Sequence, residues 1–197
     1  ENNANLIQVN NVANTGLGST IVKRNSNPLF RLDYTLWSSP VSGAQTLVDF
    51  SPLTTVGRFY TYNPATDLYN ITAPTTPFET GTGYLIRMPN TDPTTDYDAG
   101  TATLAYQGAF TGTPNNGTVT LGSVTPLVSD KYYAVGNPYP STISAAAFLG
   151  ANATDGTLYF WRKTNGVANT ASVSSTGTAY ATWTTLGSAS SNVAPNN

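Results

Sequence analysis

Ala102-Thr103-Leu104-Ala105-Tyr106 and Thr118-Val119-Thr120-Leu121 are the two stretches that decide the fold class. Their residues alternate with a period of two, so each stretch is predicted to be a strand with one buried face. Similar short runs recur along the chain, separated by Gly, Pro and Asn residues that favour turns. Strands are predicted near Leu6–Val9, Thr20–Lys23, Phe30–Trp37, Arg58–Tyr62, Leu68–Thr72, Gly83–Met88, Ala102–Tyr106, Thr118–Val124, Tyr132–Val135, Leu158–Arg162 and Tyr180–Thr184. Many short strands joined by turns predict an all-β, antiparallel, sandwich-like fold.

One short helix is predicted within this β-rich pattern, over residues 144–149. Ser144 can cap its first turn, the alanines that follow have the highest helix propensity, and Gly150 can end it. A helix of fewer than two turns is not stable alone, so it must pack on a sheet. Asn116-Gly117 is a signal for a type I′ hairpin turn, because both residues accept positive φ values.

The composition of the chain excludes several classes of function. Only 9% of the 197 residues are charged and the net charge is −2, against about 25% charged residues in an average soluble protein. The basic residues form no stripe of the kind that binds nucleic acid. The apolar runs are much shorter than the roughly 20 residues of a membrane-spanning helix, so no membrane insertion is expected. The first residues do not have the charged start and apolar middle of a signal peptide, so Glu1 is expected to follow a processing or cloning boundary.

Catalytic chemistry is also limited by composition. The chain has no cysteine and no histidine, which excludes Ser-His and Cys-His nucleophiles and histidine or thiolate metal sites. A pair of carboxylates for glycoside hydrolysis would have to come from side chains such as Asp33, Asp49, Glu79, Asp130 and Asp155. Their spacing supports no particular pair, so the chain is predicted not to be an enzyme.

An acidic loop is the sharpest local feature of the sequence. Asn90, Asp92, Asp96 and Asp98 bring carboxylates and an amide together within nine positions. Calcium prefers six to eight oxygen ligands, and a turn-rich loop can wrap around one ion. The loop lacks the glycine and the final glutamate of an EF-hand, so an ordinary solvated turn is the alternative to a calcium site.

Aromatic residues are abundant, with twelve Tyr, seven Phe and three Trp. Tyr and Trp serve well at binding faces, because one end of each side chain tolerates water while the ring stacks on apolar surfaces. The alternative is that these side chains form the core of the sandwich. The candidate ligand-binding residues are Trp37, Tyr60, Tyr62, Tyr139, Trp161 and Trp183.

The two parts of the chain show a weak internal sequence repeat. Each runs from a proline-bearing turn, through a loop that contains a phenylalanine, to an aromatic strand. We therefore predict a first β unit over residues 1–130 and a related second unit over 131–197, either as two packed units or as one continuous domain. The second part has no counterpart of Gly81–Ile86, so a true duplication would leave a sheet edge open to another chain.

Seven segments spread over nearly the whole chain form a recognisable succession. They are Leu6–Asn10, Val22–Asn25, Arg31–Val41, Phe50–Pro52, Arg58–Asn63, Gly136-Asn137-Pro138-Tyr139-Pro140-Ser141 and Leu158–Trp161. This succession resembles large secreted surface proteins of Flavobacterium-type Bacteroidota, and the segment over residues 136–141 is its most specific part. The resemblance implies an extracellular or outer-surface location, export by the type IX secretion system and an adhesin-like role, and it supplies no catalytic residues. It also implies that a further Gly-x-Gly aromatic strand follows where this chain ends, so the chain is a fragment, a processed form, or completed by a neighbour.

Three functions remain open at this point. The first is a structural and adhesive module that presents loops and aromatic faces on a rigid β scaffold. The second is self-assembly into a filament or layer through open strand edges, which predicts large particles that deletion of residues 1–12 abolishes. The third is a carbohydrate-binding module of a longer secreted protein, with surface glycans as partners.

Overall fold

The computed structural model describes residues 3–15, 19–91, 96–121, 131–152, 154–161 and 180–189. Its strands pair antiparallel in three sheets, which confirms the predicted all-β class. The described strands are β1 (Thr20–Leu29), β2 (Tyr34–Trp37), β3 (Val41–Ser42), β4 (Phe59–Asn63), β5 (Leu68–Ile71), β6 (Tyr84–Arg87), β7 (Leu104–Pro114), β8 (Thr157–Trp161), β9 (Tyr180–Thr184) and β10 (Gly187–Ala189). The described helices are α1 (Leu47–Phe50), α2 (Asp96–Ala99) and α3 (Ala145–Ala151).

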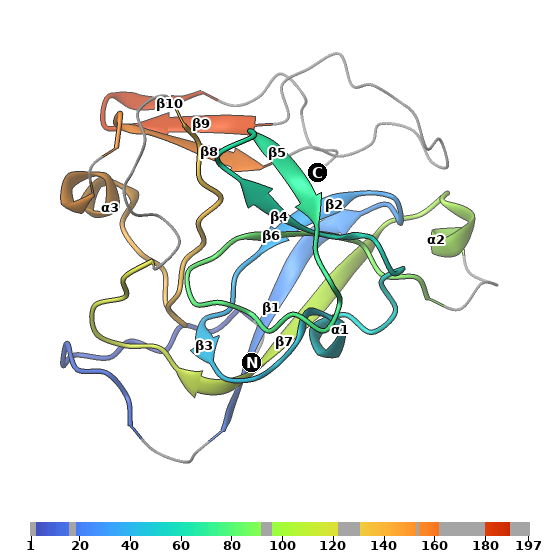
Figure 1. Ribbon diagram of the computed structural model, residues 1–197, viewed down its shortest axis with the longest axis horizontal. Coiled ribbons are helices and arrows are strands. Elements are labelled where there is room, and N and C mark those ends of the chain that lie inside the picture. The colour runs from blue at the N-terminus through green and yellow to red at the C-terminus, as the bar shows by residue number, and fades with distance from the viewer. Residues whose placement is uncertain are drawn as a thin grey trace.

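Two of the sheets form a sandwich around the main core. One has the strand order β1-β7-β3 and the other β2-β6-β4-β5. Val22 and Phe110, which are register partners in the first sheet, meet Phe59 and Ile86, which are register partners in the second. All four side chains are buried, so the apolar faces of both sheets are removed from water. The third sheet, β10-β9-β8, lies next to β5 at the top of Figure 1.

Helix α1 closes the core between the sheets. Thr46 and Asp49 form a capping box, in which the Asp49 amide donates to the Thr46 hydroxyl at 3.2 Å and the Thr46 amide donates to the Asp49 carboxylate at 3.0 Å. The capped turn buries Leu47 and Phe50. A second cluster, made by Leu29, Met88 and Tyr97, lies beside the first one.

The predicted helix is present as α3, which begins one residue later and ends two residues later than expected. The Ala147 amide donates to the Ser144 hydroxyl at 3.2 Å, which is the predicted cap. Leu149 is buried and anchors the helix, while the chain continues in helical form through Gly150 to Ala151. None of the helices in the described part of the chain is long and apolar enough to cross a bilayer.

Three predicted strands are not strands in the described residues. They are residues 6–9, residues 118–124, which are described only as far as 121, and residues 132–135, where Val135 alone forms a bridge, with Thr82. Residues 6–9 are held instead by contacts with distant loops, for example by the Leu6 amide, which donates to the Pro140 carbonyl at 3.0 Å. Gly117 has a φ of +79°, but Asn116 is not among the described residues with positive φ, so the predicted type I′ turn is wrong. The chain does not return along β7 as a hairpin. The Asn116 side-chain amide donates to the carbonyls of Asn10 and Val12, so tertiary contacts replace the expected ladder.

Candidate functional site

The outer face of the four-stranded sheet carries a row of tyrosines. Side chains alternate between the two faces of a strand, and Phe59 on β4 points into the core, so Tyr60 and Tyr62 point outward. Tyr60 makes an edge-to-face contact with Tyr34 of β2, with ring centroids 5.8 Å apart. Tyr62 contacts its cross-strand partner Tyr69 in the same way at 5.2 Å. Such pairs stabilise the sheet beyond the area that they bury.

The third sheet adds a second row of aromatic rings. Tyr159 on β8 contacts Tyr132 at 5.5 Å and Tyr180 on β9 at 6.4 Å, both edge to face. Trp161 contacts its cross-strand partner Tyr180 at 5.3 Å. We call the two rows together the aromatic belt. Its members are Tyr34, Tyr60, Tyr62, Tyr69, Tyr132, Tyr159, Trp161 and Tyr180.

Two hydrogen bonds join the two rows. The Trp161 indole N–H donates to the backbone carbonyl of Tyr34 at 2.9 Å. The hydroxyls of Tyr69 and Tyr180 are also hydrogen-bonded to each other. The third sheet is therefore fixed at one end to the outer face of the four-stranded sheet.

The rings of the belt form similar pairs on the two hairpins, and the duplication of the two units stays a prediction. Tyr62–Tyr69 and Trp161–Tyr180 are both cross-strand partners in edge-to-face contact. The contact of Tyr132 with Tyr159 likewise matches that of Tyr34 with Tyr60 in ring distance and orientation. In each half a capped helix, α1 or α3, precedes the hairpin that carries the rings.

The belt is exposed at one end, and its rings are neutral. Tyr132 is 53% exposed and Tyr159 is 43% exposed. Burial raises the pKa of Tyr62, whose hydroxyl also donates to Asp67, and burial likewise raises the pKa of Tyr69 and Tyr159. These hydroxyls stay protonated below the ordinary tyrosine pKa of about 10. The exposed end therefore offers neutral hydrogen-bonding groups on aromatic rings.

The structure distributes the six predicted aromatic residues over different environments. Tyr60, Tyr62 and Trp161 belong to the belt, whereas Trp37 is buried in the main core. Tyr139 lies in the proline-rich turn, where its hydroxyl donates to the Gly117 carbonyl at 2.7 Å.

Trp183 is half-buried on β9, on the face of the third sheet opposite to Tyr180. Phe160, which is 49% exposed, lies on that same opposite face, because its neighbour Tyr159 belongs to the belt.

The residues of the predicted calcium loop have polar partners within the protein. Asp98 accepts hydrogen bonds from the Thr91 amide at 3.1 Å and from the Thr91 hydroxyl at 2.6 Å. The Asn90 side-chain oxygen faces the guanidinium of Arg31 at 3.5 Å, and Asp96 lies at the start of α2. The fourth predicted ligand, Asp92, lies outside the described residues, within which no three acidic groups converge on one point.

Calcium binding at this loop stays a prediction, and the melting temperature tests it. A calcium site that includes Asp98 predicts a melting temperature that falls when a chelator is added, and Asp98→Asn should remove that fall. A local turn predicts the same melting temperature with calcium and with chelator, and a lower one for Asp98→Asn under both conditions. The second outcome would contradict the calcium assignment.

Three of the carboxylates considered for catalysis are held by local hydrogen bonds. Asp33 accepts from the Phe30 amide at 2.9 Å, and Asp155 accepts from the Thr157 amide at 2.9 Å. The hydroxyl and amide of Thr46 lower the pKa of Asp49 by hydrogen bonding to its charged form. Of the remaining two, Glu79 lies in the loop before β6, and Asp130 falls outside the described residues.

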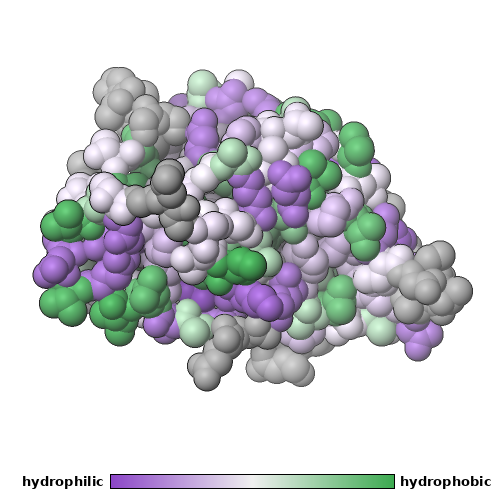
Figure 2. All heavy atoms as spheres, turned by 90° about the horizontal axis from the view of Figure 1, so that it is seen from below, coloured by the Kyte–Doolittle hydropathy of each residue, from purple (hydrophilic) through white to green (hydrophobic). Residues whose placement is uncertain are grey.

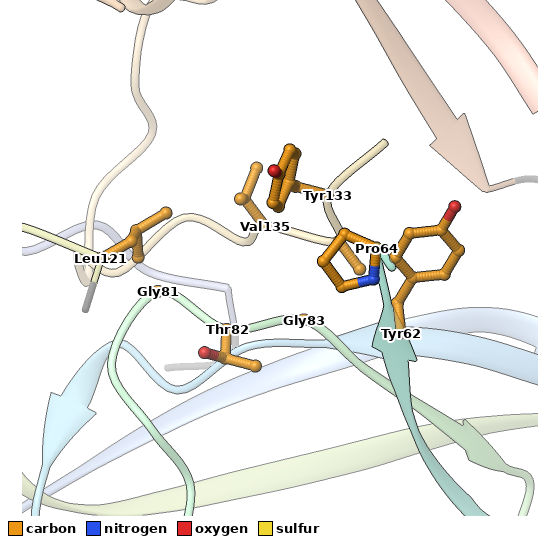
Figure 3. A pocket seen from close by; sticks show the side chains of 9 residues that line it. Tyr62, Pro64, Gly81, Thr82, Gly83, Leu121, Tyr133 and Val135 are labelled. Atoms are coloured by element: carbon orange, nitrogen blue, oxygen red, sulfur yellow. The ribbon is translucent and has the colours of Figure 1, made fainter. Parts of the chain in front are cut away.

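A small cavity of about 80 Å³ lies beside the bridge between Thr82 and Val135. Leu121 lines one side of it, and Tyr62, Pro64 and Tyr133 line the other (Figure 3). Pockets that enclose small organic ligands measure roughly 300–1,000 Å³. This cavity has room for a few water molecules, so the belt is the stronger candidate site.

Comparisons with known proteins yield one match. The chain matches no curated protein and no solved structure. One family model matches all of residues 1–197, and the chain belongs to that family, which is described as Domain of unknown function (DUF8693).

Proposed function

We propose that this chain is a non-enzymatic adhesive module of a bacterial surface protein, which binds its target through the exposed end of the aromatic belt. One observation carries the proposal: Tyr132 and Tyr159 form an edge-to-face pair whose rings are about half exposed on a sheet that is anchored to the sandwich. Rigid, amphipathic tyrosines supply contact area at a low cost in conformational entropy.

The way in which the belt is held supports this role. Trp161 and Tyr180 connect the exposed pair to the outer face of the four-stranded sheet. A ligand that stacks on Tyr159 therefore meets a ring that is already positioned by its neighbours. Preorganisation of this kind raises affinity, because fewer side chains have to be ordered on binding.

An extracellular location and export by the type IX system belong to the same proposal. They are supported by the low content of charged residues, the absence of cysteine and the resemblance carried by residues 136–141. Low charge also limits electrostatic repulsion between copies displayed side by side on a surface.

A second candidate is self-assembly, and the N-terminal loop favours it. Ile7, Val9 and Val12 are 78%, 95% and 67% exposed. Figure 2 shows hydrophobic side chains gathered at the end of the molecule where Figure 1 places this loop. Exposed apolar clusters mark interaction surfaces in soluble proteins, and the particle size of the purified protein tests whether copies associate.

The adhesive proposal is tested by removing the exposed pair. The double variant Tyr132→Ala/Tyr159→Ala should lose retention on the insoluble polysaccharide that holds the wild-type protein best, in a panel of cellulose, chitin and cross-linked alginate. An aromatic hot spot contributes about 2 kcal/mol, so removing one predicts a roughly 30-fold loss of affinity. Depletion of protein from the supernatant measures the binding constant.

Phe160→Ala is the matched control, because Phe160 is equally exposed on the same strand but lies on the opposite face. This control should bind as the wild-type protein does. An equal loss in the control and the double variant, or no retention of the wild-type protein on any member of the panel, would contradict the proposal.

A further inference from the structure

Asp155 is an exposed carboxylate just before the strand that carries Tyr159. Its Oδ1 accepts a hydrogen bond from the Thr157 amide at 2.9 Å. Gly156, which lies between these two residues, has a φ of +87°, a value that glycine adopts without strain. The turn into β8 therefore restrains the carboxylate, although its side chain is open to solvent.

The Asp155 carboxylate lies near the exposed ring pair of the aromatic belt. Thr157 and Tyr159 point to the same face of β8, because side chains two residues apart along a strand share a face. The Tyr159 hydroxyl is hydrogen-bonded to the hydroxyls of Tyr132 and Thr157. Burial, the neighbouring Tyr132 and the negative charge of Asp155 raise the pKa of Tyr159, in that order. A carboxylate, two rings and a threonine hydroxyl thus meet at the exposed end of the belt.

This carboxylate has no positively charged partner in the described part of the chain. Its printed hydrogen bond comes from the neutral amide of Thr157, and it forms no ion pair there. Lys131, the exposed residue before Tyr132, is likewise not paired with it. An ionised carboxylate has two oxygens that accept hydrogen bonds, so Oδ2 of Asp155 is open to a donor from a ligand.

A carboxylate beside exposed aromatic rings is suited to an ammonium group. The negative face of a tyrosine ring attracts a cation, and the rings of Tyr132 and Tyr159 are 53% and 43% exposed. A carboxylate also accepts stronger hydrogen bonds from an ammonium group than from a neutral amide or hydroxyl. The two features together favour a positively charged ligand over a neutral one of the same shape.

We propose that Asp155 and the Tyr132–Tyr159 pair bind the ammonium groups of an amino polysaccharide. The inference rests on the proposed adhesive function and names the ligand class of the same site. A sugar polymer fits the belt better than a basic peptide, because Thr157, Tyr159 and Trp161 follow one another along one face of β8. Successive sugar rings can stack on the aromatic rings, while the ammonium group binds at Asp155.

The test compares soluble oligomers of glucosamine with oligomers of N-acetylglucosamine, which share a backbone and differ in the charge of the nitrogen. In mildly acidic buffer, where the glucosamine amine carries a proton, the wild-type protein should bind the glucosamine oligomer about tenfold more tightly. This preference should shrink as salt rises. Asp155→Asn keeps the acceptor for the Thr157 amide but removes the charge, so it should bind both oligomers with equal affinity, measured by titration calorimetry.

Glu79→Gln is the matched control, because it removes the same charge from an exposed side chain in the loop before β6. It should keep the preference of the wild-type protein, and circular dichroism should show that both variants fold. Equal affinity of the wild-type protein for the two oligomers, or the same loss of preference in both variants, would overturn the proposal. Binding of polylysine as tight as that of the glucosamine oligomer would also overturn it, in favour of a basic protein partner.

The double variant Tyr132→Ala/Tyr159→Ala separates this inference from the adhesive proposal. If the double variant loses polysaccharide binding and the wild-type protein shows no preference for glucosamine, the adhesive function remains and the ammonium ligand class is overturned. If Asp155→Asn loses the glucosamine preference while the double variant binds both oligomers as the wild-type protein does, the role of the exposed rings is contradicted. Loss of both oligomers in the double variant, with loss of the preference alone in Asp155→Asn, supports both.

Discussion

Replacing Phe50 by alanine should lower the free energy of unfolding by about 3–5 kcal/mol. Phe50 is 3% exposed at the end of α1 and lies at the centre of the main core. Its ring stacks on Phe110 with centroids 4.5 Å apart and makes edge-to-face contacts with Trp37, Phe78 and Tyr106. Truncation leaves a cavity that these large rings cannot fill, and urea titration measures the loss.

Leu53→Ala is the control for this truncation. Leu53 follows Phe50 by three residues and is 59% exposed, so its removal should change the free energy of unfolding by less than about 0.5 kcal/mol. A loss below about 1 kcal/mol for Phe50→Ala would contradict the packing of α1 between the sheets.

Gly108→Ala should also destabilise the protein, through overpacking. A Cβ atom at Gly108 would lie 2.5 Å from Cζ and 2.6 Å from Cε2 of Phe50, and 3.1 Å from Cζ3 of Trp37. Neither ring can withdraw, because both are enclosed in the core. We expect the free energy of unfolding to fall by about 1–3 kcal/mol. Without the clash, replacing a glycine in a strand by alanine ordinarily raises it by about 0.5–1 kcal/mol.

A double-mutant cycle checks the cause of that loss. In the Phe50→Ala background the ring that blocks the new Cβ is absent. There, Gly108→Ala should lower the free energy of unfolding by at least about 0.5 kcal/mol less than it does in the wild-type protein. Independent sites are additive to within about 0.5 kcal/mol, so a difference of this size shows that the two residues are coupled. Additive losses would show that Gly108 is required for some reason other than the close approach of Phe50. Urea titration of the four proteins gives the coupling energy.

The sequence predicts those elements that carry their own local signals. Arg58–Tyr62 was expected as a strand and β4 covers Phe59–Asn63, while the Ser144 cap located α3. Helix α1 was missed, although Thr46 and Asp49 have the spacing of a capping box. Residues 6–9 have the composition of a strand but are held by loop contacts, because pairing depends on a partner that composition does not specify.

The candidate site depends on strand order, which is why the sequence indicates only part of it. Tyr60 and Tyr62 were candidates because tyrosine suits binding faces, and their outward direction follows from the buried position of Phe59. Tyr132 and Tyr159 were not singled out, since their contact requires the third sheet to be in place.

Hydroxyl-radical footprinting of the protein bound to its best-retaining polysaccharide tests the adhesive role of the belt most directly. Tyr132, Tyr159, Phe160 and Ile7 are all exposed in the free protein, so each reports on one surface. The proposed function predicts that binding protects Tyr132 and Tyr159, while Phe160 and Ile7 keep the reactivity of the free protein. Protection of Phe160 or Ile7, with Tyr132 and Tyr159 unchanged, would contradict it and place the binding surface elsewhere.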